Sequence, residues 1–250
     1  MILGAEPFSM GAGSHAVLFL HGWSSTPREL RFLAEQASRA GFHCLGPLLK
    51  GHGTRLQDLM PTRFEDYLAQ AEEAYAALAS RHERVSVCGL SMGGLIGLNL
   101  AATRPVAGLV LVAPFLIPWG RTFGLPNRWL VGRVPLPSIM AKSPGGPIQD
   151  PITAPEHIAY HAMATRSMIS VVKAGRAFLP RIPRVASPTL ILHSVQDATS
   201  DFRGSQKLIE KLGSADKTLV AYNQGDHLIT LDYERDKLER TVLDWLLKRR

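Results

Sequence analysis

A serine between two glycines is the first feature of the sequence that could do chemistry. The pentapeptide Gly89-Leu90-Ser91-Met92-Gly93 follows a run rich in β-branched residues and precedes an apolar stretch. At a sharp turn from strand to helix, glycines two residues before and after a serine relieve crowding of the backbone. The pentapeptide alone is a weak signal, and such a serine could merely cap a helix. Its place between a strand and a helix favours a nucleophile.

A serine hydroxyl becomes a good nucleophile only when a base removes its proton and an acid orients that base. When the serine lies on a strand-to-helix turn of a mostly parallel sheet, the chain order is serine, acid, histidine. Asp197 follows the apolar run 189–193, and His227 stands five residues after Tyr222, where another such run ends. The sequence therefore predicts Ser91 as nucleophile, Asp197 as acid and His227 as base.

Two other aspartates lie close to these positions. Asp201 stands four residues after Asp197 and could replace it as the acid. Asp226 directly precedes His227, and we expect its side chain to point elsewhere. Asp197 is preferred because it follows its strand most closely.

Backbone N–H groups near the serine could stabilise the negative charge of a tetrahedral intermediate. The amide of Met92 lies at the expected N-terminus of a helix, where the helix dipole favours negative charge. His21-Gly22-Trp23 follows another apolar run, and its glycine lets the backbone approach closely. We therefore expect the amides of Trp23 and Met92 to form an oxyanion hole. His21 is expected to shape the loop rather than to act in catalysis or bind a metal.

Alternating strand and helix patterns indicate which elements position these residues. Strands are expected at residues 15–20, 42–46, 85–90, 108–112, 189–193 and 218–222. Two helices are expected to begin at capping patterns, one at Thr26 to Glu29 and one at Thr62 with Glu65. Three more are expected between Ser91 and Pro105, at residues 205–212 and at residues 236–248. Strands separated by single helices imply right-handed crossovers, so we predict an α/β fold with a doubly wound, mostly parallel sheet.

Residues 114–180 depart from this alternation, because prolines and aromatic residues recur there without a regular pattern. An insertion of this length between late strands favours a cap over the site rather than a linker. We predict a core of residues 1–113 and 181–250 and a cap of residues 114–180. Some large apolar side chains of the cap are expected to line an acyl pocket, with Trp119, Phe123, Trp129 and Met140 as the candidates.

Composition limits the class of protein. The chain of 250 residues, 46% hydrophobic and 20% charged, is typical of a globular domain with a large core. Its apolar runs are too short for a membrane span or the core of a signal peptide, so we expect neither. Cys44 and Cys88 both lie in apolar runs, which favours buried thiols in a reducing cytoplasm.

The formal net charge of +7 raises nucleic acid or an anionic membrane as a possible partner. Between Pro105 and Gln196 there are nine basic residues and two acidic ones, so this segment carries the whole excess. Because no nucleic-acid-binding motif is present, we expect no nucleic-acid partner. The basic, apolar cap could instead make peripheral contact with anionic lipid. The oligomeric state does not follow from the sequence.

Four motifs lie outside residues 114–180: His21-Gly22-Trp23, Lys50-Gly51-His52-Gly53, Gly89-Leu90-Ser91-Met92-Gly93 and His227-Leu228-Ile229-Thr230-Leu231-Asp232. With them, nearly the whole chain outside the cap resembles the small bacterial carboxylesterases and monoacylglycerol lipases of the α/β-hydrolase superfamily. The resemblance implies a triad of Ser91, Asp197 and His227 and ester hydrolysis through an acyl-enzyme. The family usually has a small residue where this chain has Asp226. The cap matches poorly, which leaves the substrate open.

Other activities remain compatible with these residues. The same fold and triad could hydrolyse thioesters, lactones or carbon–carbon bonds. A non-enzymatic ligand receptor on the same scaffold is disfavoured because all elements of a triad and an oxyanion hole are present. A dehalogenase or epoxide hydrolase with an aspartate nucleophile is excluded because position 91 is serine.

Metal and nucleotide cofactors are not expected. His157 and His161 are four residues apart, but a zincin would place glutamate after the first histidine, whereas Glu156 precedes it. The glycines from Gly89 to Gly94 lack the spacing of a dinucleotide-binding loop. The substrate is therefore expected to be a small acyl ester, hydrolysed without a cofactor.

Overall fold

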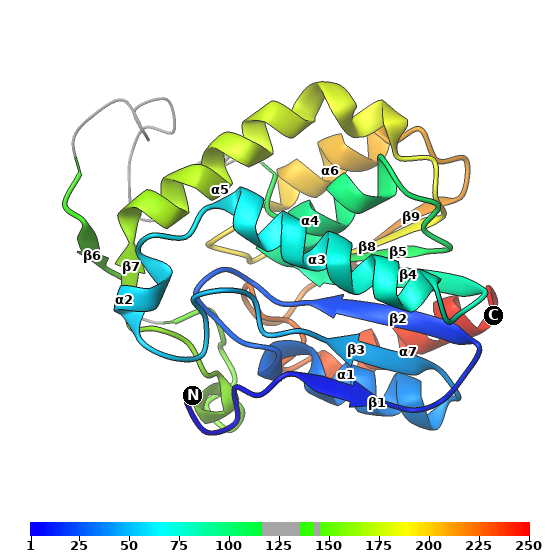
Figure 1. The fold of residues 1–250 in the computed structure, drawn as a ribbon, viewed down its shortest axis with the longest axis horizontal. Helices are drawn as coiled ribbons and strands as arrows, with labels where there is room; N and C mark the ends of the chain where they lie inside the picture. Colours follow the sequence, from blue (N-terminus) through cyan, green and yellow to red (C-terminus); the bar gives the residue numbers. More distant parts are fainter. Residues whose placement is uncertain (117–135, 143–145) are drawn as a thin grey trace.

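A computed structural model describes residues 1–116, 136–142 and 146–250, and a seven-stranded sheet crosses the molecule (Figure 1). The sheet order is β1-β3-β2-β4-β5-β8-β9. Its strands are β1 (Phe8–Met10), β2 (His15–Leu20), β3 (His43–Gly46), β4 (Arg84–Leu90), β5 (Leu109–Val112), β8 (Thr189–Ser194) and β9 (Lys217–Tyr222). Within this sheet, over the residues described, β1 runs antiparallel to its neighbour β3 and the other neighbouring strands are parallel. The predicted mostly parallel α/β sheet is confirmed.

Helices cover both faces of the sheet (Figure 1). They are α1 (Arg28–Arg39), α2 (Leu56–Leu59), α3 (Phe64–Ala79), α4 (Met92–Ala101), α5 (Thr165–Phe178), α6 (Phe202–Lys211) and α7 (Arg235–Leu247), with 3₁₀ helices at Ala154–Glu156 and Leu179–Arg184. On one face α1 packs against α7, and on the other α3, α4 and α5 pack together. Among the described residues, no helix is long and apolar enough to cross a membrane.

The central strands are apolar on both faces because helices cover both. Successive side chains of a strand point to opposite faces of the sheet. Leu111 of β5 therefore packs in the apolar cluster under α3 and α4, whereas Val110 packs in the cluster against α1 and α7. Since β2, β4, β5 and β8 are parallel, their carboxyl ends meet at one edge of the sheet.

The chain between β5 and β8 contains a second, smaller sheet. β6 (Ile139–Ala141) pairs antiparallel with β7 (Ala162–Ala164), and β7 leads directly into α5. Helix α5 packs against α3 and α4. The division into a core of residues 1–113 and 181–250 and a cap of residues 114–180 stays a prediction.

At two helix starts the capping groups expected from the sequence have other partners. The capping box at Thr26 does not form, because the Thr26 hydroxyl donates to the carbonyl oxygen of Ile158 and the Glu29 carboxylate accepts the Gly22 N–H. Helix α1 begins at Arg28 instead. Backbone groups from outside the helix thus compete successfully for both capping side chains.

The start of α3 lies one residue later than the capping pattern of Thr62 predicts. Arg63 is the residue before the helix, and its N–H donates to the carboxylate of Asp66 at 2.9 Å. The Thr62 hydroxyl donates to the carbonyl oxygen of Leu59. The N-terminal cap is therefore made by a carboxylate within the first turn of the helix.

Candidate active site

Ser91 occupies a strained turn between β4 and α4. Its backbone has φ +52° and ψ −113°, in the left-handed half of φ space that residues with a side chain rarely adopt. A Cβ atom at Gly89 would collide with the carbonyl oxygen of Gly93, and one at Gly93 would collide with that of Leu20. Only glycine fits at these two positions. The turn holds Ser91 at the carboxyl end of β4, with 8% of the residue exposed.

Asp197 and His227 are brought together from loops after neighbouring strands. His227 Nδ1 lies 2.7 Å from Asp197 Oδ2, and Asp197 Oδ1 accepts the N–H groups of Thr199 and Ser200 at 2.7 Å each. Burial raises the pKa of Asp197, but the charge of His227 and hydrogen bonds from His193 and His227 outweigh it and keep the pKa well below its usual value. Asp197 is therefore an ionised carboxylate that accepts the Nδ1 proton of His227.

The environment of His227 makes it a stronger base than an isolated histidine. Burial lowers the pKa of His227, but the carboxylates of Asp197, Glu29 and Asp226 outweigh burial and raise it above its ordinary value. Because Asp197 binds the Nδ1 proton, Nε2 is the nitrogen that can accept a proton from a reacting group.

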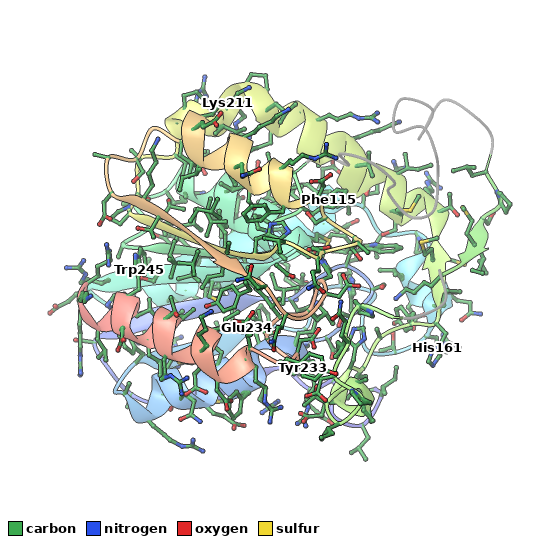
Figure 2. All side chains as sticks on the ribbon, turned by 180° about the vertical axis from the view of Figure 1, so that it is seen from behind. Phe115, His161, Lys211, Tyr233, Glu234 and Trp245 are labelled. Atoms are coloured by element: carbon green, nitrogen blue, oxygen red, sulfur yellow. The ribbon has the colours of Figure 1, made fainter. Side chains whose placement is uncertain are left out.

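The loop that carries His227 is held by two acids that follow it. The carboxylate of Glu234 accepts the N–H groups of Asn223 and Gln224 at 2.8 Å each. Glu234 and Tyr233 lie where α7 begins (Figure 2). The buried carboxylate of Asp232 accepts four backbone N–H groups, from Gln149, Asp150, Asp226 and Tyr233. The position of His227 is therefore set by hydrogen bonds on both sides of its loop.

A cavity of about 720 Å³ connects the predicted site residues, since Trp23, Ser91, Met92 and His227 all line it. Apolar side chains form one part of its lining: Leu90, Phe115, Met163, Met168, Val171 and Leu228. Polar side chains form another: Ser24, Ser25, Glu29, Lys142, His157 and Asp226. The cavity can therefore hold a molecule with an apolar and a polar part.

The loop around Trp23 is fixed by buried side chains on both sides. The Gly22 N–H donates to Glu29 Oε2 at 2.8 Å, and the Ser24 N–H donates to His52 Nε2 at 3.0 Å. Both acceptors are almost fully buried. The backbone of Trp23 therefore lies between two anchored amides beside the cavity.

His21 and His52 form a buried pair behind this loop. His21 Nε2 accepts the Leu49 N–H at 3.0 Å, and its Nδ1 donates to the carbonyl oxygen of Gly22 at 2.9 Å. Burial lowers the pKa of both rings, that of His52 to about 3. Neutral rings can accept backbone N–H groups, so this pair supports the loop.

Three residues of the polar lining were missed by sequence analysis. The sequence pattern places Glu29 in a capping box and assigns His157 no role, yet His157 Nε2 lies 3.5 Å from Glu29 Oε1. Lys142 Nζ donates to Ser24 Oγ at 2.8 Å. His161, four residues after His157, is exposed at the periphery (Figure 2). The contacts join segments far apart in the chain, so no local pattern predicts them.

The remaining candidates are four apolar residues of the predicted cap and two aspartates near the predicted triad. Trp119, Phe123 and Trp129 are outside the described residues. Met140 of β6 is half-buried against an apolar cluster, outside the described lining of the cavity. Asp201 caps α6 through the Arg203 N–H, and Asp226 accepts the Ala198 N–H at 2.8 Å. Contact of the four apolar residues with substrate stays a prediction.

Comparison with known proteins gives consistent matches over almost the full chain. A family model described as serine aminopeptidase, S33, matches residues 12–234. The chain is 30% identical over 251 residues to a thermostable monoacylglycerol lipase of Bacillus sp. strain H-257, covering 99% of this chain and 96% of that protein. It is 28% identical to a carboxylesterase of Bacillus subtilis strain 168, covering 97% and 96% of the two chains.

The fold is also shared with solved structures. One reported with LipS and LipT, two metagenome-derived lipolytic enzymes, superposes with a TM-score of 0.89 at 25% identity and covers 99% of both chains. The strand-to-helix serine, the buried aspartate–histidine pair and the match over residues 12–234 agree with one another. The chain therefore belongs to the serine aminopeptidase S33 family of the α/β-hydrolase superfamily and is a hydrolase.

Proposed function

We propose that this hydrolase cleaves carboxylic esters, including monoacylglycerols, through an acyl-enzyme on Ser91. The observation that carries the proposal is the buried Asp197–His227 pair, 2.7 Å apart, whose histidine lines the same cavity as Ser91 on its strained turn. If Ser91 merely capped a helix and His227 were a solvated loop residue, no buried carboxylate would be needed beside the histidine. Nor would a strained backbone be needed at the serine. The relatives named monoacylglycerol lipase and carboxylesterase support the same reaction.

In the proposed cycle His227 Nε2 removes the proton of the Ser91 hydroxyl as the oxygen attacks the ester carbonyl. Asp197 holds the Nδ1 proton and stabilises the imidazolium. The N–H groups of Trp23 and Met92 donate to the oxyanion. His227 then protonates the leaving alcohol, and a water activated by the same ring releases the acid from Ser91.

The two kinds of cavity lining support a substrate with two unlike ends. Phe115, Met163 and Met168 offer apolar surface for an acyl chain, whereas Ser24 and Lys142 offer hydrogen-bonding groups for a hydroxylated alcohol. A monoacylglycerol has both features. Trp119, Phe123, Trp129 and Met140 are proposed to extend the acyl-binding surface.

The proposal includes peripheral contact with anionic lipid. Arg166 and Lys173 of α5 and Arg184 at the end of the following 3₁₀ helix are exposed, and no acidic residue occurs between Glu156 and Asp197. Such a basic segment attracts anionic headgroups. Binding to vesicles with anionic lipid should exceed binding to neutral vesicles at low salt, and equal binding would refute this contact. A cytoplasmic location is also proposed, because both cysteines are free and buried.

Labelling with a fluorophosphonate probe tests the nucleophile without knowledge of the substrate. We expect covalent labelling that maps to Ser91, with loss of both labelling and ester turnover in Ser91→Ala. Ser80→Ala, at the exposed end of α3, is the matched control and should behave as wild type. Retention of most turnover by Ser91→Ala would refute the proposal.

A substrate panel then distinguishes the ester reaction from its alternatives. The panel contains monoacylglycerols of graded chain length, nitrophenyl esters, a thioester, a lactone and an aminoacyl arylamide. We expect kcat/KM to be highest for the oxygen esters of a medium or long acyl chain. A preference for the arylamide would instead indicate aminopeptidase activity, in line with the description of the family model.

A further inference from the structure

The acid of the proposed triad has a second histidine on the same carboxylate oxygen. His193 lies at the end of β8, is fully buried, and places its Nε2 3.0 Å from Asp197 Oδ2. The same Nε2 lies 2.7 Å from the carbonyl oxygen of Ser200. Since the proposed mechanism uses only His227, His193 is a buried titratable side chain that the reaction leaves without a role.

The hydrogen-bond partners of His193 fix its tautomer. A ring nitrogen between a carboxylate and a carbonyl oxygen must carry a proton, because both neighbours only accept. On the other side of the ring, Nδ1 lies 2.6 Å from the hydroxyl oxygen of Ser205, which can donate to it. A neutral ring with its proton on Nε2 therefore satisfies all three contacts.

Asp197 consequently accepts four hydrogen bonds. The rings of His227 and His193 donate to Oδ2, and the backbone N–H groups of Thr199 and Ser200 donate to Oδ1. Four donors fix the plane of the carboxylate. The four donors also share the negative charge of the carboxylate, so that only part of this charge acts on His227.

We propose that His193 is a positioning residue of this site: its Nε2–H holds Asp197 Oδ2 against His227 and shares the charge of the carboxylate, so that His227 becomes a free base at a lower pH than Asp197 alone would allow. The inference rests on the proposed function. It assigns His193 a role through Asp197 and no contact with substrate.

The other charged residues around the two rings are left in place when His193 is replaced. Besides Asp197, His227 is affected by Glu29 from α1 and by Asp226 from its own loop. Asp201, at the start of α6, is the further acid that interacts with His193. A change in the titration of His227 after substitution of His193 therefore indicates a change at the Asp197 carboxylate, which both rings contact.

The test compares His193→Met, which removes the donor, with His193→Gln, whose amide can replace the Nε2–H. The readouts are the pH dependence of kcat/KM on a nitrophenyl ester and the titration of His227 by NMR. We expect His193→Met to shift the acidic limb of the pH profile, where kcat/KM falls at low pH, upward by about half a pH unit. The reason is that Asp197 with one hydrogen-bond donor fewer favours the imidazolium form of His227 more strongly. His193→Met should also lower kcat by a larger factor than the factor by which it raises KM.

His193→Gln is expected to keep the acidic limb near its wild-type position. A role in packing alone would lower activity equally at every pH and leave the limb unmoved in both variants, and that result would overturn the proposal. Ser205→Ala removes the hydroxyl that orients the His193 ring and should shift the limb in the same direction by a smaller amount. If His193→Met does not fold, the pH profile of Ser205→Ala is measured in its place.

The titration separates this inference from the proposed function. NMR titration of His227 in a Ser91→Ala background requires no turnover. If wild-type protein fails to hydrolyse esters but the His227 titration still moves in His193→Met, the proposed function is wrong and the role of His193 stands. If turnover is normal and the titration does not move, only the role of His193 is refuted.

Discussion

At Asp197 a single carboxylate determines the tautomer of His227 and contributes most to its basicity. Its Oδ2 lies 2.7 Å from His227 Nδ1, so the proton stays on the nitrogen that faces away from the reacting groups. An amide at this position would have the same shape but could present a donor to Nδ1. The ring would then carry its proton on Nε2, where a base is needed.

Asp197→Asn should therefore lower kcat by roughly a thousandfold or more while leaving the fold intact. Steady-state kinetics on a nitrophenyl ester, with circular dichroism as the check on folding, measures this. Asp201→Asn is the matched control, because Asp201 caps α6 and pairs with Arg203 and makes no hydrogen bond to His227 in the described structure. If Asp201→Asn lost more activity than Asp197→Asn, the assignment of the acid would be wrong.

The basicity of His227 determines where activity is lost on acidification. Its pKa is raised above the ordinary 6.5, because the nearby carboxylates outweigh the effect of burial. Protonated His227 cannot accept the serine proton, so kcat/KM should fall as pH drops through a value above 6.5. A pH profile on an uncharged ester checks this. An acidic limb at or below 6.5 would show that the carboxylates do not outweigh burial.

Among the elements, α1 is connected through Glu29 to the loop that carries Trp23. Glu29 lies in its first turn, and the carboxylate accepts the Gly22 N–H at 2.8 Å. Burial raises the pKa of Glu29, but hydrogen bonds from His157, Ser25 and Gly22 and the charge of His157 outweigh it and lower the pKa. Glu29 is therefore a buried anion that anchors the backbone next to Trp23.

Glu29→Ala should displace this loop and lower kcat roughly tenfold to a hundredfold, because a misplaced oxyanion donor loses its interaction with the transition state. Glu29→Gln keeps an acceptor for the Gly22 N–H and should retain most of the activity. Glu35→Gln, on the same helix, is the control. Full activity of Glu29→Ala in steady-state kinetics would mean that the loop keeps its shape without this anchor.

The regular alternation of strands and helices could be predicted from the sequence, whereas α5, inside the irregular residues 114–180, and the short β1 and α2 could not. The expected strand at 15–20 coincides with β2, and the expected strand at 85–90 differs from β4 by one residue. In contrast, β1 has three residues and α2 has four, too few for periodicity to indicate them. Both depend on tertiary contacts, as the pairing of β1 with β3 shows.

The predicted site was limited in a similar way. Ser91, Asp197 and His227 each follow a strand of the parallel sheet, so the topology alone predicts that they meet at one edge. The roles of Glu29 and Lys142 depend on side chains that meet only in the folded chain. Burial, which cannot be deduced from neighbours in sequence, distinguishes Glu29 from an ordinary capping residue.

Across the whole molecule, Asp232 links the segment before the first 3₁₀ helix to the loop of His227. Its fully buried carboxylate accepts N–H groups from Gln149 and Asp150 on one side and from Asp226 and Tyr233 on the other. The Leu228 N–H, in addition, donates to the carbonyl oxygen of Pro147. The wall of the cavity and the loop of His227 are thus held by one carboxylate.

Removing this carboxylate should affect stability and catalysis together. Asp232→Ala leaves four backbone N–H groups without their buried acceptor, which should lower the free energy of unfolding by about 2 to 4 kcal/mol. Urea unfolding measures that loss. The kcat of the folded fraction should also fall, because the loop no longer holds His227 against Asp197. Asp232→Asn keeps one oxygen acceptor and should give intermediate values of both.

Asp236→Asn is the control at the exposed start of α7, where Asp236 lies 3.8 Å from Arg235 in a surface ion pair that contributes little to stability. It should unfold and turn over as wild type does. If Asp232→Ala loses stability but keeps its kcat, the loop of His227 is positioned by Glu234 and by the Asp197 contact alone. In that case Asp232 stabilises the fold without any part in placing the histidine.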